Sequence, residues 1–241
     1  MKAVAYIGSP RGEESNTYKL TEQFLNRLQK ELELKYKIFS TSNCKIENCK
    51  GCLGCFDRWC KCKAIHDDLE IIIEEMLNAD IIILASPVYM HNVSGNMKNF
   101  IDRLSIWCHF MKLAGKIGVT ISYSRSNGNI FVSDYLTKVM TYWGVAVISN
   151  IDYLNINLDT NLDTNESEAI KKIIDVINKK KKMDVTAQNT IFNVYKSAFQ
   201  NLGKKNPDDV EYNYWENSGM LEKNSFEELL GDKNIYLVDK Q

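Results

Sequence analysis

Residues 80–89 of the chain read DIIILASPVY, and this stretch decides the fold. The large apolar residues Ile81–Leu84 predict a central parallel strand, because such a strand is covered on both faces and needs no polar alternation. The Ser-Pro pair that follows ends the apolar run and begins a loop. We therefore expect a buried strand over Asp80–Ser86, with a loop at its carboxyl end.

Outward from this strand, predicted strands and helices alternate along the chain. The expected strands are Lys2–Ser9, Glu33–Ser40, Asp80–Ser86, Lys116–Ser122 and Ala146–Ile151. The expected helices are Asn16–Lys30, Asp67–Asn78, Ser94–Leu113, Ile130–Tyr142 and Glu166–Lys182. This alternation is typical of an α/β protein with a doubly wound parallel sheet, and five strands suit the order 2-1-3-4-5.

The pattern also predicts where the main domain ends. Residues 1–182 carry the alternating strands and helices and should form one domain. Residues 183–241 are more polar and less periodic, although Asn189–Leu202 and Asn224–Leu230 have helical spacing. We expect this part to be a C-terminal helical extension rather than an independent domain.

Composition excludes several classes of partner. The 241 residues include 30 Lys and Arg against 31 Asp and Glu, so no global charge favours nucleic acid or an anionic membrane. No apolar run reaches membrane-spanning length. The N-terminal residues lead directly into a predicted strand without the features of a signal peptide, so we expect a cytoplasmic protein.

The loop after the first strand has the composition of a phosphate site. Residues 8–17 read GSPRGEESNT, which supplies hydroxyls, backbone amides and one guanidinium at the start of a helix. The loop lacks both Gly-x-Gly-x-x-Gly and the Gly-Lys-Ser/Thr ending of nucleoside triphosphate loops. A single monophosphate therefore fits this loop better than a pyrophosphate.

A second segment makes the ligand more specific. Residues 86–103 read SPVYMHNVSGNMKNFIDR. Together with the first loop, this segment resembles the NAD(P)H-dependent FMN reductase and iron–sulfur flavoprotein group of the flavodoxin-like superfamily. That group carries Gly-Ser-Pro-Arg and Asn-Thr in its first loop, and Ser-Pro-Val-Tyr followed by Lys-x-Phe-Ile/Leu-Asp-Arg after its third strand. The resemblance covers roughly the first 150 to 180 residues.

The resemblance implies a flavodoxin-like fold with bound FMN. The residues that would hold the phosphate are Ser9, Arg11, Ser15, Asn16 and Thr17. The residues expected near the isoalloxazine are Pro87, Val88, Tyr89, Met90 and Asn92, with Tyr123 and Ser124 from the loop after the fourth strand. In the helix that carries the second motif, the resemblance favours packing and ion pairing at a subunit interface for Lys98 and Arg103.

The function implied by the resemblance is that of an FMN-dependent oxidoreductase. It would accept hydride from NAD(P)H and pass electrons to a quinone, a flavin or another small acceptor. Because the flavin carries the chemistry, we expect no catalytic side chain. Two alternatives stay open: an iron–sulfur flavoprotein that carries electrons with ferredoxin, and a thiol-based regulatory protein. Relatives assemble as dimers or tetramers, so we expect a homodimer or homotetramer.

Six of the seven cysteines lie between Cys44 and Cys62. Their spacing, Cys49-x2-Cys52-x2-Cys55 with Cys60 and Cys62 following, is typical of a loop around a [4Fe–4S] cluster. By resemblance the ligands would be Cys49, Cys52, Cys55 and Cys62, with Cys60 as the alternative fourth. Two other interpretations stay open: thiols that are vestigial or redox-reactive, and a zinc site, although Cys60-x-Cys62 is short for a zinc ligand pair.

Overall fold

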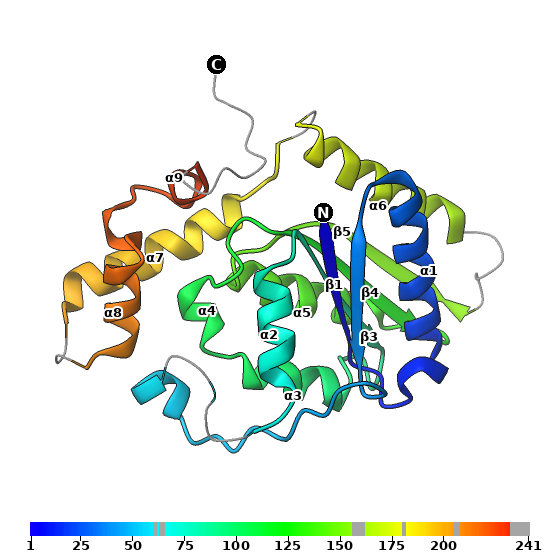
Figure 1. Ribbon diagram of the computed structural model, residues 1–241, viewed down its shortest axis with the longest axis horizontal. Helices are drawn as coiled ribbons and strands as arrows, with labels where there is room; N and C mark the ends of the chain where they lie inside the picture. The colour runs from blue at the N-terminus through cyan, green and yellow to red at the C-terminus, as the bar shows by residue number, and fades with distance from the viewer. Residues whose placement is uncertain (60–61, 63–65, 156–161, 180–181, 205–207, 232–241) are drawn as a thin grey trace.

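The computed structural model describes residues 1–59, 62, 66–155, 162–179, 182–204 and 208–231. A parallel sheet of five strands lies at its centre, in the order β2-β1-β3-β4-β5 (Figure 1). The strands are β1 (Lys2–Ile7), β2 (Lys35–Ser40), β3 (Ile81–Pro87), β4 (Ile117–Ser124) and β5 (Ala146–Leu154). The predicted α/β class and strand order are both confirmed.

Helices cover both faces of the sheet (Figure 1). One face carries α1 (Asn16–Glu31) and α6 (Leu162–Ile177), and the other carries α2 (Leu69–Leu77), α3 (Gly95–Arg103) and α5 (Asn129–Tyr142). Every residue of β3 is buried. Alternate β3 side chains serve the two cores, with Ile81 and Ile83 in one and Ile82 and Leu84 in the other. This double burial explains why the strand is apolar throughout.

The predicted helix Ser94–Leu113 is two helices in the structure. After α3 the chain tightens into a turn and then forms the short α4 (Trp107–Phe110). The residues Leu104, Ile106 and Trp107 are all buried. Since residues two apart lie on nearly opposite sides of a helix, a straight helix would expose one of them. The turn lets all three face the core.

We refer to residues 44–66 as the cysteine segment. It connects β2 to α2, and its described part contains a π-helical turn over Cys55–Trp59 where the sequence predicts only a loop. Phe56 and Asp57 donate their N–H groups to the carbonyl of Leu53, which begins this turn. Cys60 lies outside the described residues.

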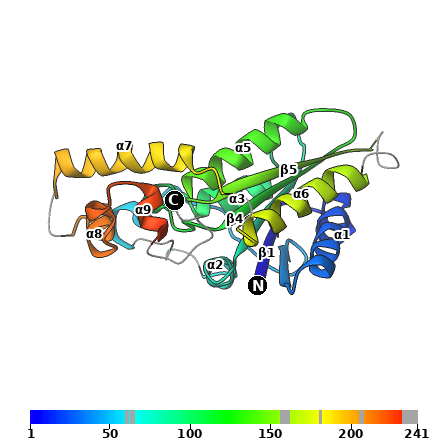
Figure 2. The same cartoon turned by 90° about the horizontal axis from the view of Figure 1, so that it is seen from above.

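The C-terminal residues form α7 (Thr186–Leu202), α8 (Val210–Asn217) and α9 (Phe226–Gly231). Figure 2 shows them beyond one end of the sheet, away from α1 and α6. The Nε1 of Trp215, a fully buried side chain, donates to the carbonyl of His109 in α4 at 2.8 Å. Gln188 donates to the carbonyl of Val145 at 2.6 Å. These bonds attach the extension to the α/β layer, and the domain boundary at residue 182 stays a prediction.

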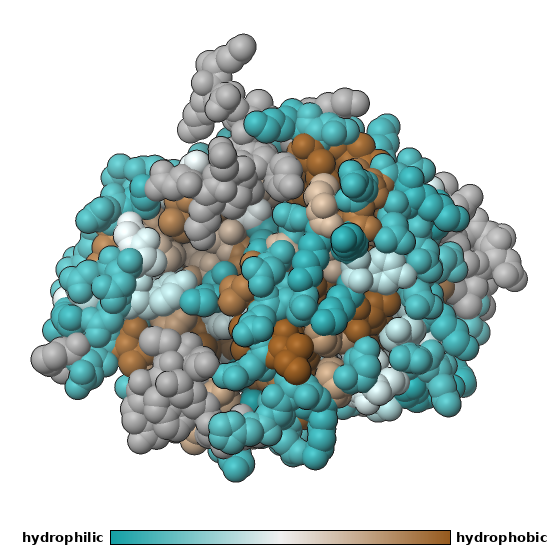
Figure 3. Space-filling view, in the orientation of Figure 1, coloured by the Kyte–Doolittle hydropathy of each residue, from teal (hydrophilic) through white to brown (hydrophobic). Residues whose placement is uncertain are grey.

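The surface around α2 is mostly hydrophilic, and its hydrophobic side chains form small separate patches (Figure 3). Exposed Ile71 and Leu77 belong to α2. Among the helices that the structure describes, none has the length and apolar character needed to cross a membrane.

Candidate functional site

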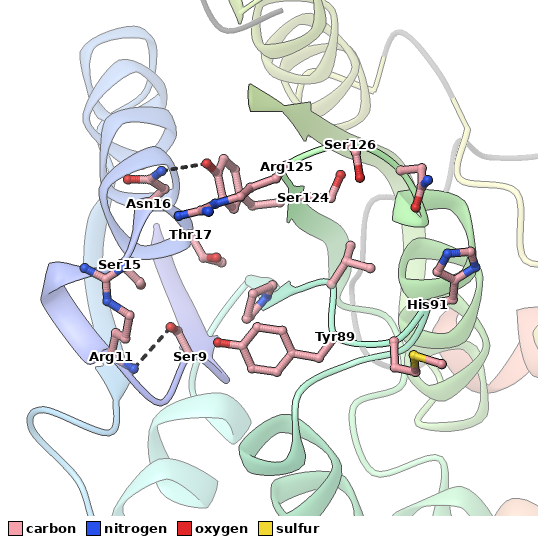
Figure 4. Close-up of a pocket in the computed structure, with 15 residues that line it drawn as sticks. Ser9, Arg11, Ser15, Asn16, Thr17, Tyr89, His91, Ser124, Arg125 and Ser126 are labelled. Atoms are coloured by element: carbon pink, nitrogen blue, oxygen red, sulfur yellow. Dashed lines mark hydrogen bonds between the residues drawn. The ribbon is translucent and has the colours of Figure 1, made fainter. Parts of the chain in front are cut away.

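A pocket of about 430 Å³ opens at the carboxyl ends of β1, β3 and β4 (Figure 4). This edge of a doubly wound sheet is the usual place for a ligand. All but one of the predicted FMN residues line it: Ser9, Arg11, Ser15, Asn16, Thr17, Pro87, Val88, Tyr89, Met90, Tyr123 and Ser124. His91, which the sequence places between two predicted contacts, also lines it, as do three residues that the prediction left out, Arg125, Ser126 and Asn127. The last three directly continue the loop after β4, so their position after a strand end was the available signal.

The first and second loops approach each other because Gly8 has no side chain. A Cβ at Gly8 would stand 2.4 Å from the Cβ of Met97, in the first turn of α3. The N–H of Gly8 donates to the carbonyl of Ala85 at 2.9 Å, which holds the end of β1 against β3. The hydroxyl of Ser94, the N-cap of α3, donates to the carbonyl of Gly8. The N-terminus of α3 is therefore fixed beside the pocket.

The first loop presents a buried, unpaired hydroxyl at the start of α1. Thr17 is 1% exposed, and its Oγ1 has no hydrogen-bond partner among the described residues. Ser15, by contrast, is fully used as the helix N-cap: its Oγ accepts from Tyr18 N at 3.1 Å and donates to Gly12 O at 2.7 Å. The first amides of an α-helix lack intrahelical partners. Ser15 therefore shapes the loop, while Thr17 and the helix amides face the pocket.

Two guanidinium groups belong to this pocket, Arg11 from the first loop and Arg125 from the loop after β4 (Figure 4). Both residues are exposed. The backbone N–H of Arg11 donates to the Oγ of Ser9 at 3.4 Å, and its side chain donates to Glu14 O at 3.4 Å. Cations beside a helix N-terminus favour a bound anion.

The second loop is a tight turn with an unusual backbone. Tyr89 and Asn92 exchange N–H···O bonds of 2.9 and 3.0 Å, and the two residues between them, Met90 and His91, have φ values of +50° and +58°. Two consecutive positive φ values define a type I′ turn, which normally takes Gly or Asn. Side chains held in this conformation are strained, and such strain occurs most often at functional sites.

The side chains of this turn differ in how far they are exposed to solvent. Met90 is 98% exposed and Tyr89 is 46% exposed, and both line the pocket. The ring of His91 stacks on Phe131 of α5 with centroids 5.3 Å apart. The Oδ1 of Asn92 accepts from Val93 N at 2.8 Å, and Asn92 is the predicted residue that does not line the pocket. Its side chain completes the turn.

Tyr123 and Ser124, predicted in the loop after the fourth strand, are the last residues of β4, and side-chain hydrogen bonds fix this strand end. The hydroxyl of Tyr123 accepts from Asn16 Nδ2 at 2.7 Å and donates to Asn155 Oδ1 at 3.0 Å, which joins β4 to α1 across the pocket (Figure 4). Ser124 donates to the buried Oδ1 of Asn129 at 2.5 Å. The loop after β4 is thus anchored on both sides of the pocket.

A second, smaller cavity of about 50 Å³ lies inside the cysteine segment. The four predicted ligands, Cys49, Cys52, Cys55 and Cys62, line it together with Leu53, Phe56, Arg103 and Ser105. Burial raises the pKa of the Cys55 thiol. Cys44 lies apart and donates to Ser40 O at 3.0 Å, and burial raises its pKa to about 11. Cys44 therefore behaves as a packed thiol.

The residues of the first pocket fit FMN. A buried hydroxyl with no partner among the described residues, the N-terminus of a helix and a guanidinium are the groups that a phosphate monoester requires. The apolar Val88 and Tyr89 of the second loop suit a flat aromatic ring.

The cysteine cavity fits an iron–sulfur cluster better than a single metal ion. In the described part of the chain, no three Cys, His, Asp or Glu side chains are close enough to hold one metal ion. Each cysteine of a four-iron cluster binds its own iron, so its sulfur atoms stand further apart than the four ligands of zinc. Four thiols around one cavity, with apolar Leu53 and Phe56 beside them, match the larger group.

Comparison with known proteins places the chain in a family. The family model described as NADPH-dependent FMN reductase matches residues 1–157. An iron-sulfur flavoprotein of Methanosarcina thermophila is 30% identical over 187 residues, which cover 73% of this chain and 95% of that protein. An iron-sulfur flavoprotein of Archaeoglobus fulgidus is 35% identical over 61% of this chain and 66% of its own length. One of Methanocaldococcus jannaschii is 35% identical over 53% of this chain and 65% of its own length. The matches to the last two thus span slightly less than two thirds of those proteins.

Solved structures extend the likeness of fold beyond the sheet. RosB with a bound 8-demethyl-8-formylriboflavin-5'-phosphate intermediate aligns with a TM-score of 0.58 at 13% identity, over 100% of this chain and 91% of that one. An apo NADH:FMN oxidoreductase, EMOB, aligns with a TM-score of 0.51 at 19% identity, over 86% and 92% of the two chains. At these identities the likeness concerns the fold alone. The match of the family model and the relative from M. thermophila lead to the same conclusion: the chain belongs to the NADPH-dependent FMN reductase family.

Proposed function

We propose that this chain is an FMN-dependent oxidoreductase that takes reducing equivalents from NAD(P)H and passes them to a quinone, a flavin or another small acceptor. The observation that carries the proposal is the pocket at the carboxyl edge of the sheet, with the unpaired Thr17 hydroxyl at its phosphate end. The family match supports the same chemistry.

Each wall of the pocket has a separate task in this proposal. Thr17 Oγ1, Ser9 Oγ and the first amides of α1 would bind the phosphate, with Arg11 adding positive charge. Pro87, Val88, Tyr89 and Met90 would lie along the ring system, and Tyr123 and Ser124 would close the third side. Bound FMN would supply the electron chemistry, since a flavin exchanges electrons with both nicotinamides and one-electron acceptors.

The direct test is flavin binding by the purified chain. We expect FMN to bind with a visible flavin spectrum and the loaded protein to oxidise NADH or NADPH in the presence of a quinone. Riboflavin, which lacks the phosphate, should bind much more weakly, because the helix N-terminus and Arg11 lose their anion. A chain that binds neither FMN nor riboflavin would refute the proposal.

The cysteine cavity favours a second candidate function, that of an electron carrier with a [4Fe–4S] cluster and a ferredoxin partner. Four thiols around one cavity and the similarity to the iron-sulfur flavoproteins of A. fulgidus and M. thermophila support it. Steady-state kinetics separate the two candidates. Turnover with NAD(P)H supports the oxidoreductase, whereas reduction by ferredoxin alone supports the carrier.

We propose in addition that the chain forms a homodimer or homotetramer. Met90, Ile130 and Phe131 are large apolar side chains that are more than half exposed beside the pocket. Exposed apolar groups at one site are typical of an interface. Light scattering on the FMN-loaded protein gives the oligomeric state, and a monomer would contradict this part of the proposal.

A further inference from the structure

Arg103, the last residue of α3, is buried inside the chain. Its side chain is 1% exposed, although the resemblance predicts packing and ion pairing at a subunit interface. A buried guanidinium must be paired and hydrogen-bonded to be tolerated. Its partners therefore indicate what it does.

Among the described residues, the side-chain partners of Arg103 belong to the cysteine segment or to the residue just after it. Nη1 donates to the carbonyl of Glu47 at 2.7 Å, and Nε donates to the Sγ of Cys62 at 3.2 Å. Nη1 and Nη2 bind the two carboxylate oxygens of Asp67 at 2.6 and 3.2 Å. Glu47 precedes the first predicted ligand, Cys49, and Asp67 follows the last. One side chain thus joins the two ends of the segment.

Two further groups complete this arrangement. Asp67 Oδ2 also accepts from Glu47 N at 2.8 Å. Burial alone would raise the pKa of Asp67, but the hydrogen bonds from Arg103 and from the backbone hold this pKa below its usual value. One helical turn before Arg103, Asn99 accepts from Cys49 N at 3.0 Å and donates to the carbonyl of Ile46 at 3.3 Å. The same face of α3 therefore holds both sides of the cysteine cavity.

We propose that Arg103 is the positioning residue of the cysteine-bound cluster, and that it selects Cys62 as the fourth ligand. This inference rests on the proposed iron–sulfur cluster. The planar guanidinium binds Glu47, Cys62 and Asp67 at once and so fixes their relative positions. The sulfur of Cys62 then faces the cavity lined by the other three cysteines. Its N–H···S bond also stabilises negative charge on the ligand sulfur, which favours the reduced cluster.

The test compares Arg103→Lys and Arg103→Gln with the wild type after anaerobic reconstitution with ferrous iron and sulfide. Lysine keeps the positive charge but lacks the planar set of N–H donors. The N–H···S bond to Cys62 is then lost, so we expect a cluster with a more negative midpoint potential. Glutamine loses both, and we expect iron affinity to fall about 10- to 100-fold, as is typical when a partner of a metal ligand is removed. FMN content, measured by flavin absorbance, should stay unchanged in both variants.

Lys172→Gln is the control, because Lys172 pairs with Glu168 at 2.8 Å in solvent on α6, on the opposite face of the sheet from α3. It should leave iron content and potential unchanged. Cys62→Ser should lose the cluster, whereas Cys60→Ser should keep it. Loss with Cys60→Ser alone, or unchanged potential and iron content in both Arg103 variants, overturns the inference while the cluster itself stands. A wild-type chain that takes up no iron overturns the cluster proposal and this inference with it.

Discussion

The flavin pocket and the cysteine segment are held in place by different means. The pocket is built on loops whose ends are fixed by β1, β3 and β4, the central strands of the sheet. The described part of the cysteine segment contains no strand, and side chains of α3 hold it through Asn99 and Arg103. Backbone pairing of the central strands therefore positions the first site, whereas a few side chains of α3 position the second. Substitutions should reveal this difference, since they remove side chains and leave backbone bonds intact.

The largest effect is expected from Asp67→Asn, which leaves the Arg103 charge buried without its counterion. Breaking one partner of a buried pair costs roughly 3–5 kcal/mol. We expect the cysteine segment to open, which limited proteolysis would detect, while FMN affinity changes little. Glu168→Gln, at the exposed pair with Lys172 on α6, should change stability little. Equal losses of stability in both variants would show that the Arg103–Asp67 pair does not hold the cysteine segment in place.

A smaller effect, confined to the pocket, is expected from Thr17→Val. A hydrogen bond to a charged group contributes about 1.5–3 kcal/mol, so FMN affinity should fall roughly 10- to 100-fold. Stability without FMN should not fall, because the hydroxyl has no partner among the described residues.

Thr21→Val is the control for the Thr17 prediction. Thr21 is buried one turn further along α1, and its hydroxyl donates to the carbonyl of Thr17 at 2.7 Å. Its replacement should leave FMN affinity close to that of the wild type in a calorimetric titration. The idea of a phosphate site at Thr17 fails if the two valines weaken FMN binding equally.

The attachment of the C-terminal helices should depend on pH through His109. Hydrogen bonds with Cys108 and Glu211 raise the pKa of His109 from 6.5 to about 10. The folded pKa lies above the unfolded one, so this contribution is fully present below pH 6.5 and disappears as the pH rises toward 10. Because the pair is partly solvated, we expect a loss of about 1–2 kcal/mol over this range.

Glu211→Gln tests the His109 prediction. It removes the carboxylate that meets His109 Nδ1 at 2.6 Å, so denaturant unfolding should become less dependent on pH across this range. Since α8 also packs on the π-helical turn over Cys55–Trp59, protease sensitivity of the cysteine segment should rise with pH in the wild type. An unchanged pH profile in the variant would show that Glu211 does not cause the pH dependence.

The smallest effect is expected at the strained turn. Met90 is 98% exposed and has φ of +50°, so Met90→Gly removes strain without loss of packing. Stability should rise by up to about 1 kcal/mol, whereas Met90→Ala should leave it unchanged. A melting temperature that falls with glycine would show that the turn is not strained.

The sequence predicted the sheet well because the apolar runs of β3 and its neighbours are typical of buried parallel strands. The strand order and the loops that line the pocket followed from that alternation of elements. The break between α3 and α4 could not be predicted in the same way. It depends on the burial of three neighbouring side chains, Leu104, Ile106 and Trp107, which a straight helix would not bury together.

The cysteine segment shows the limit of prediction from residue spacing. Spacing identified Cys49, Cys52 and Cys55, and the resemblance added Cys62 with Cys60 as the alternative fourth ligand. Cys49, Cys52, Cys55 and Cys62 line one cavity, and Cys60 lies outside the described residues. The role of Arg103 depends on a contact between residues 41 positions apart, which no local pattern reveals. Asn92 was predicted near the flavin; it does not line the pocket, its Oδ1 accepts from Val93 N, and its nearness to the flavin stays a prediction.

The pairing of β1 with β3 also constrains the order in which the molecule is assembled. Ala3 pairs with Ile81, so this contact closes a loop that contains the whole cysteine segment. While the chain is being synthesised, every cysteine of that segment emerges before β3 exists to close the sheet, and before α3 supplies Asn99 and Arg103. The thiols are therefore synthesised before the structure that arranges them.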